Sequence, residues 1–312
     1  MINPLVRRVG EYALSALQNI VPKTSVVTVH GTPLTEGNAV EIIGALSLRY
    51  DGTIVWLIDD DPDGWRVDGS RTPIAMVRKW TFRGLRSYLR SEVVFFTHGV
   101  YGAVKPSARQ TFVNLWHGDG IKRKPTAEGS KRSLWPATFV SGSTKMLTAR
   151  KAHDFRMPPN SELVFGNPRV VQFHDPLPSY FCDEMGLSAV NAYLIWMPTF
   201  RKSSLTGIGY EANEVTVLME QLVDAASKLD ISVVVKAHRQ DAESRGVPGT
   251  IVVTGADLAE FGISLYSLIG GSAGLITDYS SVWTDYLLLD RPPRLSHAGC
   301  RPIRADPWTI SR

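Results

Sequence analysis

Short apolar segments of strand length alternate with longer segments of helical periodicity along most of this chain. Strands that alternate with helices form parallel sheets, because each helical crossover returns the chain to the same sheet edge. This alternation places the chain in the α/β class. The predicted strands cover residues 25–30, 53–58, 92–96, 111–115, 161–165, 192–196, 231–235, 250–254 and 275–276.

The strands fall into two successive β/α halves without a repeat period, which predicts two Rossmann-like domains facing a cleft. The Pro-rich passage His174–Ser179 is the predicted link between them. We therefore expect one domain over residues 1–173 and another over residues 174–312. A chain of 312 residues with 44% hydrophobic content is long enough for two cores.

Five segments show helical periodicity, and two of them allow two interpretations. The first helix, Val6–Ile20, fits a membrane surface or a face of its own domain. Ile74–Leu89 predicts a basic helix, which fits anionic lipid or polymer, or a solvated face over a core stripe. The other predicted helices are Ala39–Tyr50, Glu214–Leu229 and Leu258–Leu268.

Charge and cysteine content narrow the class of protein. The formal net charge is +4, which favours an anionic partner. Cys182 and Cys300 are too few for a disulfide framework, which favours a reducing compartment. No apolar run approaches the roughly 20 residues of a membrane span, and the start lacks a signal-peptide pattern. We therefore expect a cytoplasmic protein, or one peripheral on the cytoplasmic face of the membrane.

The acidic run Asp59–Asp63 has two interpretations, a divalent-metal site or a solvated turn, and Pro62 and Gly64 favour the turn. The sequence has no His/Cys cluster, no H-E-x-x-H and no Walker motif. We expect no metal and no organic cofactor.

Two predicted strands end in a histidine followed by glycine, at Thr97-His98-Gly99 and Trp116-His117-Gly118. Open α/β sheets bind ligands at the carboxyl ends of their strands. His117 precedes a basic cluster at residues 122–124, and an imidazole can accept a proton near neutral pH. His117 is therefore a candidate general base, with a purely structural histidine as the alternative.

The stretch Leu275–Pro292 predicts a short strand, a polar turn and a helix. Amides at a helix start are unpaired donors in a region of partial positive charge, so Ser280 and Ser281 are placed to hold a phosphate group. The alternative is a helix cap that binds nothing.

Four blocks resemble, in order, those of the CDP-glycerol glycerophosphotransferase family, which builds glycerol-phosphate or ribitol-phosphate teichoic-acid chains in bacterial envelopes. The blocks are Asn114–Gly118, Met197–Arg201, Lys236–His238 and Leu275–Pro292. Gly166–Arg169 also resembles the family's Gly-x-Pro-Arg element. The resemblance implies a GT-B-like arrangement, with an N-terminal acceptor-side domain and a C-terminal CDP-donor-binding domain.

The resemblance also implies roles for individual residues. His117 is the implied catalytic base, and His238 is implied to bind the diphosphate or to protonate the leaving phosphate. Ala237 and Arg239 stand where the family usually has Pro. Asp278 and Asp285 are candidates to orient sugar or glycerol hydroxyls, or else they are ordinary capping or surface carboxylates. The full set of implied donor- and phosphate-binding residues is Arg201, Lys236, Thr277, Asp278, Ser280, Ser281 and Asp285.

The implied reaction transfers glycerol phosphate, or a related polyol phosphate, from a CDP-activated donor to an acceptor hydroxyl and releases CMP. The expected partners are CDP-glycerol or CDP-ribitol, a lipid-linked or polymeric polyol-phosphate acceptor and the inner face of the cytoplasmic membrane, without nucleic acid. The alternatives are a GT-B nucleotide-sugar glycosyltransferase and an inactive donor-binding remnant. The remnant is considered because the polar, Pro-punctuated stretch after Pro292 predicts a tail, which would leave the second domain incomplete.

Overall fold

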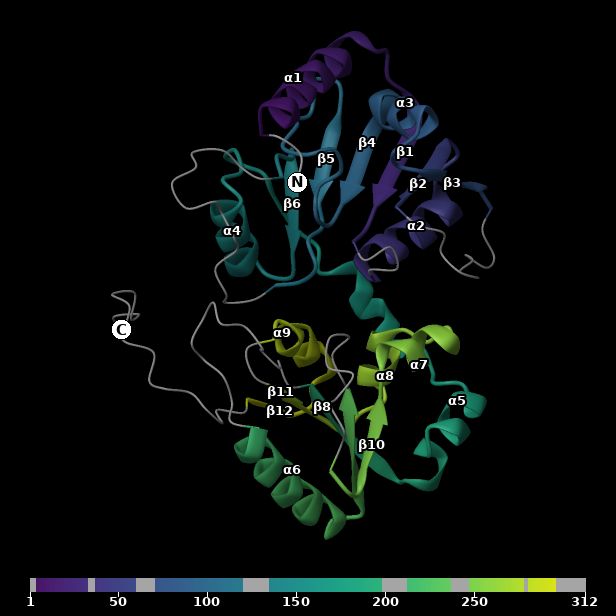
Figure 1. The fold of residues 1–312 in the computed structure, drawn as a ribbon, viewed down its shortest axis with the longest axis vertical. Coiled ribbons are helices and arrows are strands. Elements are labelled where there is room, and N and C mark those ends of the chain that lie inside the picture. The colour runs from purple at the N-terminus through teal and green to yellow at the C-terminus, as the bar shows by residue number, and fades with distance from the viewer. Residues whose placement is uncertain are drawn as a thin grey trace, which may run out of the picture. The chain divides into compact units, whose positions relative to one another are not determined.

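The computed structural model describes residues 4–32, 37–59, 71–119, 135–197, 212–236, 247–277 and 280–295. The chain divides into two compact units, Met1–Val170 and Val171–Arg312. Each unit is built on one parallel sheet, so the predicted α/β class is confirmed (Figure 1). The boundary predicted after residue 173 falls within the 3₁₀ helix η1 (Pro168–His174).

The described residues of the first unit form a seven-stranded sheet of order β3-β2-β1-β4-β5-β6-β7, in which all neighbours are parallel. The strand order reverses between β1 and β4, and such a reversal opens a crevice at the carboxyl ends of the strands. The strands are β1 (Thr24–His30), β2 (Thr53–Ile58), β3 (Ile74–Arg78), β4 (Ser91–Phe96), β5 (Thr111–Asn114), β6 (Phe139–Gly142) and β7 (Glu162–Val164).

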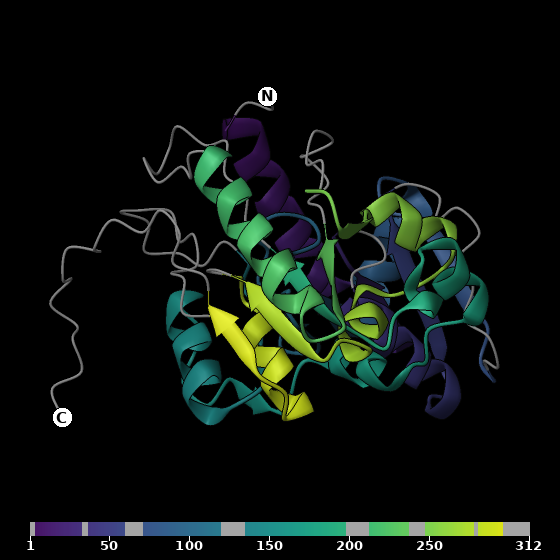
Figure 2. The same cartoon turned by 90° about the horizontal axis from the view of Figure 1, so that it is seen from below.

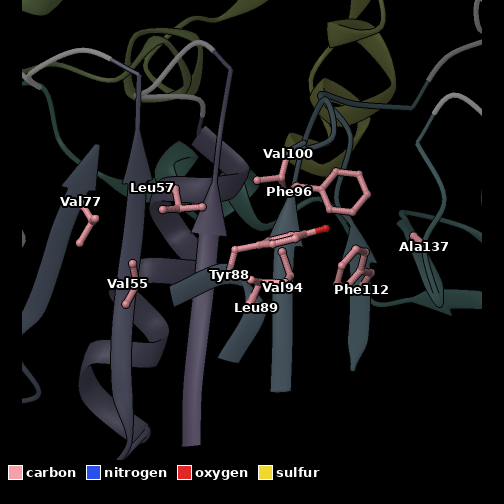
Figure 3. Close-up of a cluster of buried hydrophobic side chains, with 10 residues drawn as sticks. All are labelled: Val55, Leu57, Val77, Tyr88, Leu89, Val94, Phe96, Val100, Phe112 and Ala137. Carbon is pink, nitrogen blue, oxygen red and sulfur yellow. The ribbon is translucent and has the colours of Figure 1, made fainter. Parts of the chain in front are cut away.

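Both faces of this sheet are covered, because alternate side chains of a strand point to opposite faces. On one face, Val55 and Leu57 of β2 belong to a cluster that includes Tyr88 of α3 (Figure 3). On the other face, Trp56 of β2 packs with Ile43 of α2. The helices of this unit are α1 (Pro4–Ile20), α2 (Gly37–Arg49), α3 (Phe82–Arg90) and α4 (Lys145–Asp154).

The single basic helix predicted over Ile74–Leu89 is wrong. Residues 74–78 form β3, which pairs in parallel with β2, and the chain then turns before α3 begins. The turn ends at Thr81, whose hydroxyl accepts from the Gly84 amide at 3.1 Å and caps α3. As a result, Arg78 and Lys79 lie at the carboxyl end of a strand, where ligands bind in folds of this class.

The second unit has a five-stranded parallel sheet of order β10-β9-β8-β11-β12 in its described residues. In chain order this repeats the arrangement of the first five strands of the other unit, with the reversal between β8 and β11. Figure 2 shows β11 and β12 side by side. The strands are β8 (Ala192–Met197), β9 (Ile231–Lys236), β10 (Thr250–Val253), β11 (Gly274–Thr277) and β12 (Pro293–Leu295).

Helix α6 (Ala212–Ser227) covers one face of this sheet, where Met219 and Ala226 cluster with Trp196 and Val233. None of the helices described in either unit is long and apolar enough to cross a membrane. The remaining helical segments are α5 (Ser179–Glu184), η2 (Leu187–Ala189), α7 (Gly255–Glu260), α8 (Leu265–Gly270), α9 (Val282–Tyr286) and η3 (Leu287–Leu289).

Two further predictions in this unit are wrong. The helix predicted over Leu258–Leu268 is two short helices, because Gly262 takes a left-handed φ of +65° and Ser264 caps a new helix. The chain after Pro292 does not leave the sheet at once, since residues 293–295 form β12 beside β11. Residues 296–312 lie outside the described part of the chain.

Candidate active site

The loop after β5 carries His117 at the carboxyl edge of the first sheet, beside the reversal point. Its backbone is unusual, because Trp116 has a φ of +54° and Gly118 a φ of +131°. A left-handed conformation is costly for a residue other than glycine and persists only where neighbours enforce it. Part of that enforcement comes from Asn114, whose Oδ1 accepts from the Trp116 amide at 3.0 Å.

Two side chains from distant parts of the unit hold the carbonyl groups of this loop. Asn38 Nδ2 of α2 donates to the Trp116 carbonyl at 2.9 Å. Arg169 Nη1 of η1 donates to the His117 carbonyl at 2.7 Å. Asn38 and Arg169 are themselves joined, because the Arg169 amide donates to Asn38 Oδ1 at 3.1 Å. The backbone of His117 is therefore held from two sides.

The His117 ring lies against a second histidine. His117 Nδ1 is 2.9 Å from His98 Nε2, and the two rings are within 10° of parallel with centroids 4.7 Å apart. His98 follows β4, the strand next to β5. On its other side, His98 Nδ1 is 3.0 Å from Thr97 Oγ1, and the Thr32 amide donates to the same oxygen at 3.0 Å.

Aromatic side chains enclose the histidine pair. The Trp116 ring lies 4.0 Å from the His117 ring and 5.0 Å from the Trp135 ring, centroid to centroid. A side chain at Gly99, whose φ is +80°, would collide with the Trp135 ring. Burial in this setting lowers the pKa of His98, so its imidazole is neutral at physiological pH.

A buried ion pair supports the end of the same loop. Asp119 Oδ1 is 2.5 Å from Lys151 Nζ, and both side chains are almost fully enclosed. Asp119 Oδ2 also accepts from the Ser143 amide at 2.6 Å. Burial alone would raise the pKa of Asp119, but Lys151 and Ser143 outweigh it and hold that pKa below its usual value.

A third histidine ends β1 at the same edge. His30 Nδ1 is 3.0 Å from the Leu57 carbonyl, and its Nε2 is 3.1 Å from Lys79 Nζ. Lys79 is also 3.2 Å from Asp59. Burial, with the nearby Lys79 charge, lowers the pKa of His30 to about 4. His30 is therefore neutral at pH 7, with Nδ1 donating to Leu57 and Nε2 accepting from Lys79.

In the second unit, two predicted donor-site residues lie at the carboxyl ends of β11 and β9, the strands on either side of β8. Thr277 ends β11, and its Oγ1 donates to the carbonyl of Met197 at the end of β8, at 2.8 Å. This bond joins the two strands between which the strand order reverses. Lys236 ends β9, and its pKa is lowered by burial, with Asp257 opposing that shift.

The residues around α9 have partners within the unit. Ser280 Oγ is 3.4 Å from the Val282 amide, and Ser281 precedes the five-residue helix α9. Asp285 is fully buried, and its Oδ2 accepts from the Tyr266 hydroxyl at 2.5 Å. The role of Asp285 toward a ligand hydroxyl stays a prediction. The structure gives this carboxylate a partner inside the core.

Three predicted site residues, Arg201, His238 and Asp278, lie outside the described residues, so their roles also stay predictions. Within the described ranges there is no group of three or more His, Cys, Asp or Glu side chains that could hold a metal ion.

The sequence alone did not single out the residues that hold His117. His98 carried a signal, because it ends a strand and precedes glycine as His117 does. Asn38 carried none, since it precedes the predicted helix Ala39–Tyr50 and belongs to no motif. Arg169 belonged to a noted block, but its bond to His117 requires the fold.

Two units, each built on a parallel sheet of Rossmann-like strand order, place the chain in the GT-B-like fold class. A model of the family described as CDP-glycerol:poly(glycerophosphate) glycerophosphotransferase matches residues 12–297. The chain belongs to this family of glycerophosphotransferases, and the resemblance of its four blocks is confirmed.

Solved structures agree on the fold. A structure of the wall teichoic acid polymerase TagF matches with a TM-score of 0.63 and 17% identity, over 93% of this chain and 75% of that one. The S. aureus MnaA–UDP structure matches with a TM-score of 0.52 and 11% identity, over 88% of this chain and 79% of that one. A search of curated proteins gave no match.

Proposed function

We propose that this chain transfers glycerol phosphate from CDP-glycerol to a hydroxyl of a lipid-linked or polymeric polyol-phosphate acceptor, with His117 as the general base. The family supports the donor and the reaction type. The observation that carries the role of His117 is its fixed position, because its backbone is held by Arg169 and its ring by His98.

In this mechanism His117 accepts the proton of the acceptor hydroxyl. The acceptor oxygen then forms a bond to the phosphorus that carries glycerol, and the bond from that phosphorus to the bridging oxygen breaks. CMP leaves with the electron pair of the broken bond. Such a transfer depends on positioning and on neutralising spreading negative charge more than on covalent chemistry.

The donor phosphates are proposed to bind the second unit. Among the described residues of the predicted donor site, Lys236 is the proposed cationic ligand of the donor phosphates. Its amine is partly desolvated, and it interacts strongly with an anion because the local dielectric is low. Thr277 ends β11 at the same sheet edge, with its hydroxyl donating to Met197, and Ser280 and Ser281 follow it and offer hydroxyl donors. Arg201 and His238 complete the proposed set, with His238 holding the diphosphate or protonating the leaving phosphate and Asp278 and Asp285 orienting hydroxyls.

We also propose that α1 binds an anionic membrane surface, which would bring the enzyme to a lipid-linked acceptor. One face of α1 packs inward through Leu14 and through Gln18, whose side chain bonds to Tyr88. The other face exposes Tyr12 and Ile20, at 66% and 75%. An exposed apolar face on an amphipathic helix favours an interfacial position.

The reaction is tested by measuring CMP release from CDP-glycerol and from CDP-ribitol, each with a glycerophosphate-primed lipid acceptor. We expect release with wild-type protein and a loss of about 10²-fold or more with His117→Ala. Release that is the same in both proteins would contradict the role of His117. Turnover of a UDP- or GDP-sugar in place of both CDP-polyols would instead favour a glycosyltransferase, and donor binding without any turnover would favour an inactive remnant.

Membrane binding is tested by co-sedimentation with vesicles of phosphatidylglycerol and of phosphatidylcholine. We expect binding to the anionic vesicles that is lost in the double variant Tyr12→Glu, Ile20→Glu. The double variant Val217→Glu, Leu229→Glu is the matched control, because Val217 and Leu229 are exposed apolar residues of the other unit. Equal loss in the control, or no loss in the double variant, would contradict this role of α1.

A further inference from the structure

The contact between His98 and His117 determines the tautomer of His117 as well as the orientation of its ring. A neutral imidazole carries one proton, so one of its nitrogens donates while the other accepts. The 2.9 Å separation of His117 Nδ1 and His98 Nε2 means that one of these two nitrogens carries the shared proton. Which one carries it determines whether Nε2 of His117 can act as a base.

Two proton arrangements satisfy the chain of contacts. In the first, the Thr97 hydroxyl donates to His98 Nδ1, and His98 Nε2–H donates to His117 Nδ1. His117 then carries its own proton on Nε2 and cannot accept another there. In the second, His98 Nδ1–H donates to Thr97 Oγ1, and His117 Nδ1–H donates to His98 Nε2. Nε2 of His117 is then the basic nitrogen.

We propose that His98 is a positioning residue that holds His117 in the Nδ1–H tautomer, so that Nε2 of His117 is the nitrogen that accepts the acceptor's proton. This inference rests on the proposed role of His117 as general base.

The surroundings of His98 fit the second arrangement. Burial keeps His98 neutral, and a neutral ring can accept at Nε2, whereas an imidazolium could only donate. Thr97 Oγ1 has two acceptor positions, so it can accept from both the Thr32 amide and His98 Nδ1. When His117 gains a proton at Nε2, its Nδ1–H bond to His98 remains and becomes charge-assisted, which stabilises the imidazolium that forms.

The same surroundings explain why the pair stays aligned. The Trp116 ring packs within 4.9 Å of the His98 ring and 4.0 Å of the His117 ring, centroid to centroid. The Trp135 ring meets His98 edge-on at 6.1 Å. These aromatic neighbours pack against both imidazoles and restrict their rotation. The hydrogen bond is therefore held by packing as well as by its own energy.

The tautomer is measured directly by ¹⁵N NMR on protein labelled at histidine, without substrate, with the His117 signals assigned by their loss in His117→Ala. We expect wild-type His117 to be protonated at Nδ1 at pH 7.5. In His98→Leu we expect the Nε2–H form to become populated, because the acceptor for Nδ1–H is gone. His153→Leu is the control, since His153 is exposed on α4 and the substitution should leave the His117 signals unchanged.

Kinetics provide the second readout. The amide oxygen of Gln can occupy the place of His Nε2 and accept from His117 Nδ1–H, whereas Leu cannot. We expect His98→Leu to lower kcat by about tenfold or more, with the KM for CDP-glycerol nearly unchanged, and His98→Gln to recover most of that loss. Thermal midpoints close to that of the wild-type protein would establish that each variant is folded.

An Nε2–H tautomer of His117 in wild-type protein would overturn the inference, whether or not CMP release is observed. An unchanged kcat in His98→Leu would also overturn it, as would equal kcat losses in His98→Leu and His98→Gln with unchanged thermal midpoints. Absence of turnover by wild-type protein would instead count against the proposed function, and the tautomer of His117 would still be decided by NMR.

Discussion

The two sheets share their strand order at the reversal point but place different chemistry there. In the first unit, the strand ends carry a histidine pair enclosed by tryptophan rings and supported by a buried ion pair. In the second unit, the described strand ends carry a hydroxyl, Thr277, and an amine, Lys236. In the proposed function, one copy of the fold carries the proton acceptor and the other carries the groups that bind the donor phosphates, so the two sheets divide chemistry and donor binding between them.

The largest effect is expected from the ion pair of the first unit, which is buried, whereas the Lys228–Asp224 bridge of the second unit is exposed. Lys151→Met should lower the free energy of unfolding by about 3–5 kcal/mol, because it leaves the buried Asp119 carboxylate without its counter-ion. Hydrogen exchange followed by mass spectrometry should show the loss in the first unit.

A matched double variant sharpens this test. Adding Asp119→Leu to Lys151→Met removes both charges, and it should recover part of the stability because no uncompensated charge remains. Lys228→Met is the control, since its bridge to Asp224 is exposed and should contribute less than about 1 kcal/mol. Equal losses from Lys151→Met and Lys228→Met would contradict the importance of burial.

The next prediction distinguishes the roles of the two units by their separate effects on kcat and on donor binding. His117→Ala should lower kcat by about 10²-fold or more while the Kd for CDP-glycerol stays nearly constant. Lys236→Met should instead weaken donor binding by about tenfold, the loss expected for one charge-assisted contact. Calorimetry and CMP release measure the two quantities. Loss of donor binding in His117→Ala, with Lys236→Met harmless, would reverse the proposed division of labour.

A smaller effect concerns pH. The folded-state pKa of His30 is about 4, below its ordinary value of 6.5, so between these values the unfolded chain binds a proton that the folded chain does not. Stability is therefore full above pH 6.5 and falls as pH is lowered toward 4, by about 1 kcal/mol between pH 7 and 5.5.

The pH effect can be assigned with one substitution. In His30→Leu, denaturant unfolding should lose this part of the pH slope, because position 30 no longer titrates. His153→Leu should keep the slope, since His153 is exposed. An unchanged slope in His30→Leu would show that other groups cause the acid sensitivity.

An effect of similar size tests Asp285 in the second unit. Tyr266→Phe removes the hydroxyl that donates to Asp285 and should cost about 1–3 kcal/mol of stability, because the buried carboxylate loses a donor. If Asp285 acts only within the core, the KM for CDP-glycerol should not change in the folded variant. A raised KM with unchanged stability would favour a direct role of Asp285 toward the donor.

Secondary structure was predictable where periodicity was unambiguous. The strand 53–58 and the helix at the start of the chain match their predicted positions, because apolar runs and turn residues bound them. Ile74–Leu89 was mistaken for one helix because its apolar spacing fits both a strand followed by a helix and a single helix. Only pairing with β2 decides between them.

The sequence predicts His117 as a site residue, but it does not predict the residues that hold it. His117 follows from its place at a strand end before glycine and from the resemblance of its block. Its bond to His98 depends on β4 and β5 being neighbours, and strand order is not encoded in local spacing. Asn38 and Arg169 hold the carbonyl groups of the His117 loop and form what we call the clamp. The clamp depends on contacts across the whole unit, which a single sequence does not reveal.

That clamp sets the order in which the site is completed as the protein is made. Asn38 and Arg169 are 131 positions apart, and the loop of His117 lies between them in the chain. A ribosome releases the N-terminal part first, so Asn38 and the loop emerge well before Arg169. The histidine loop receives its final backbone bond only when nearly the whole first unit has been synthesised, which makes its geometry a late event in the synthesis of that unit.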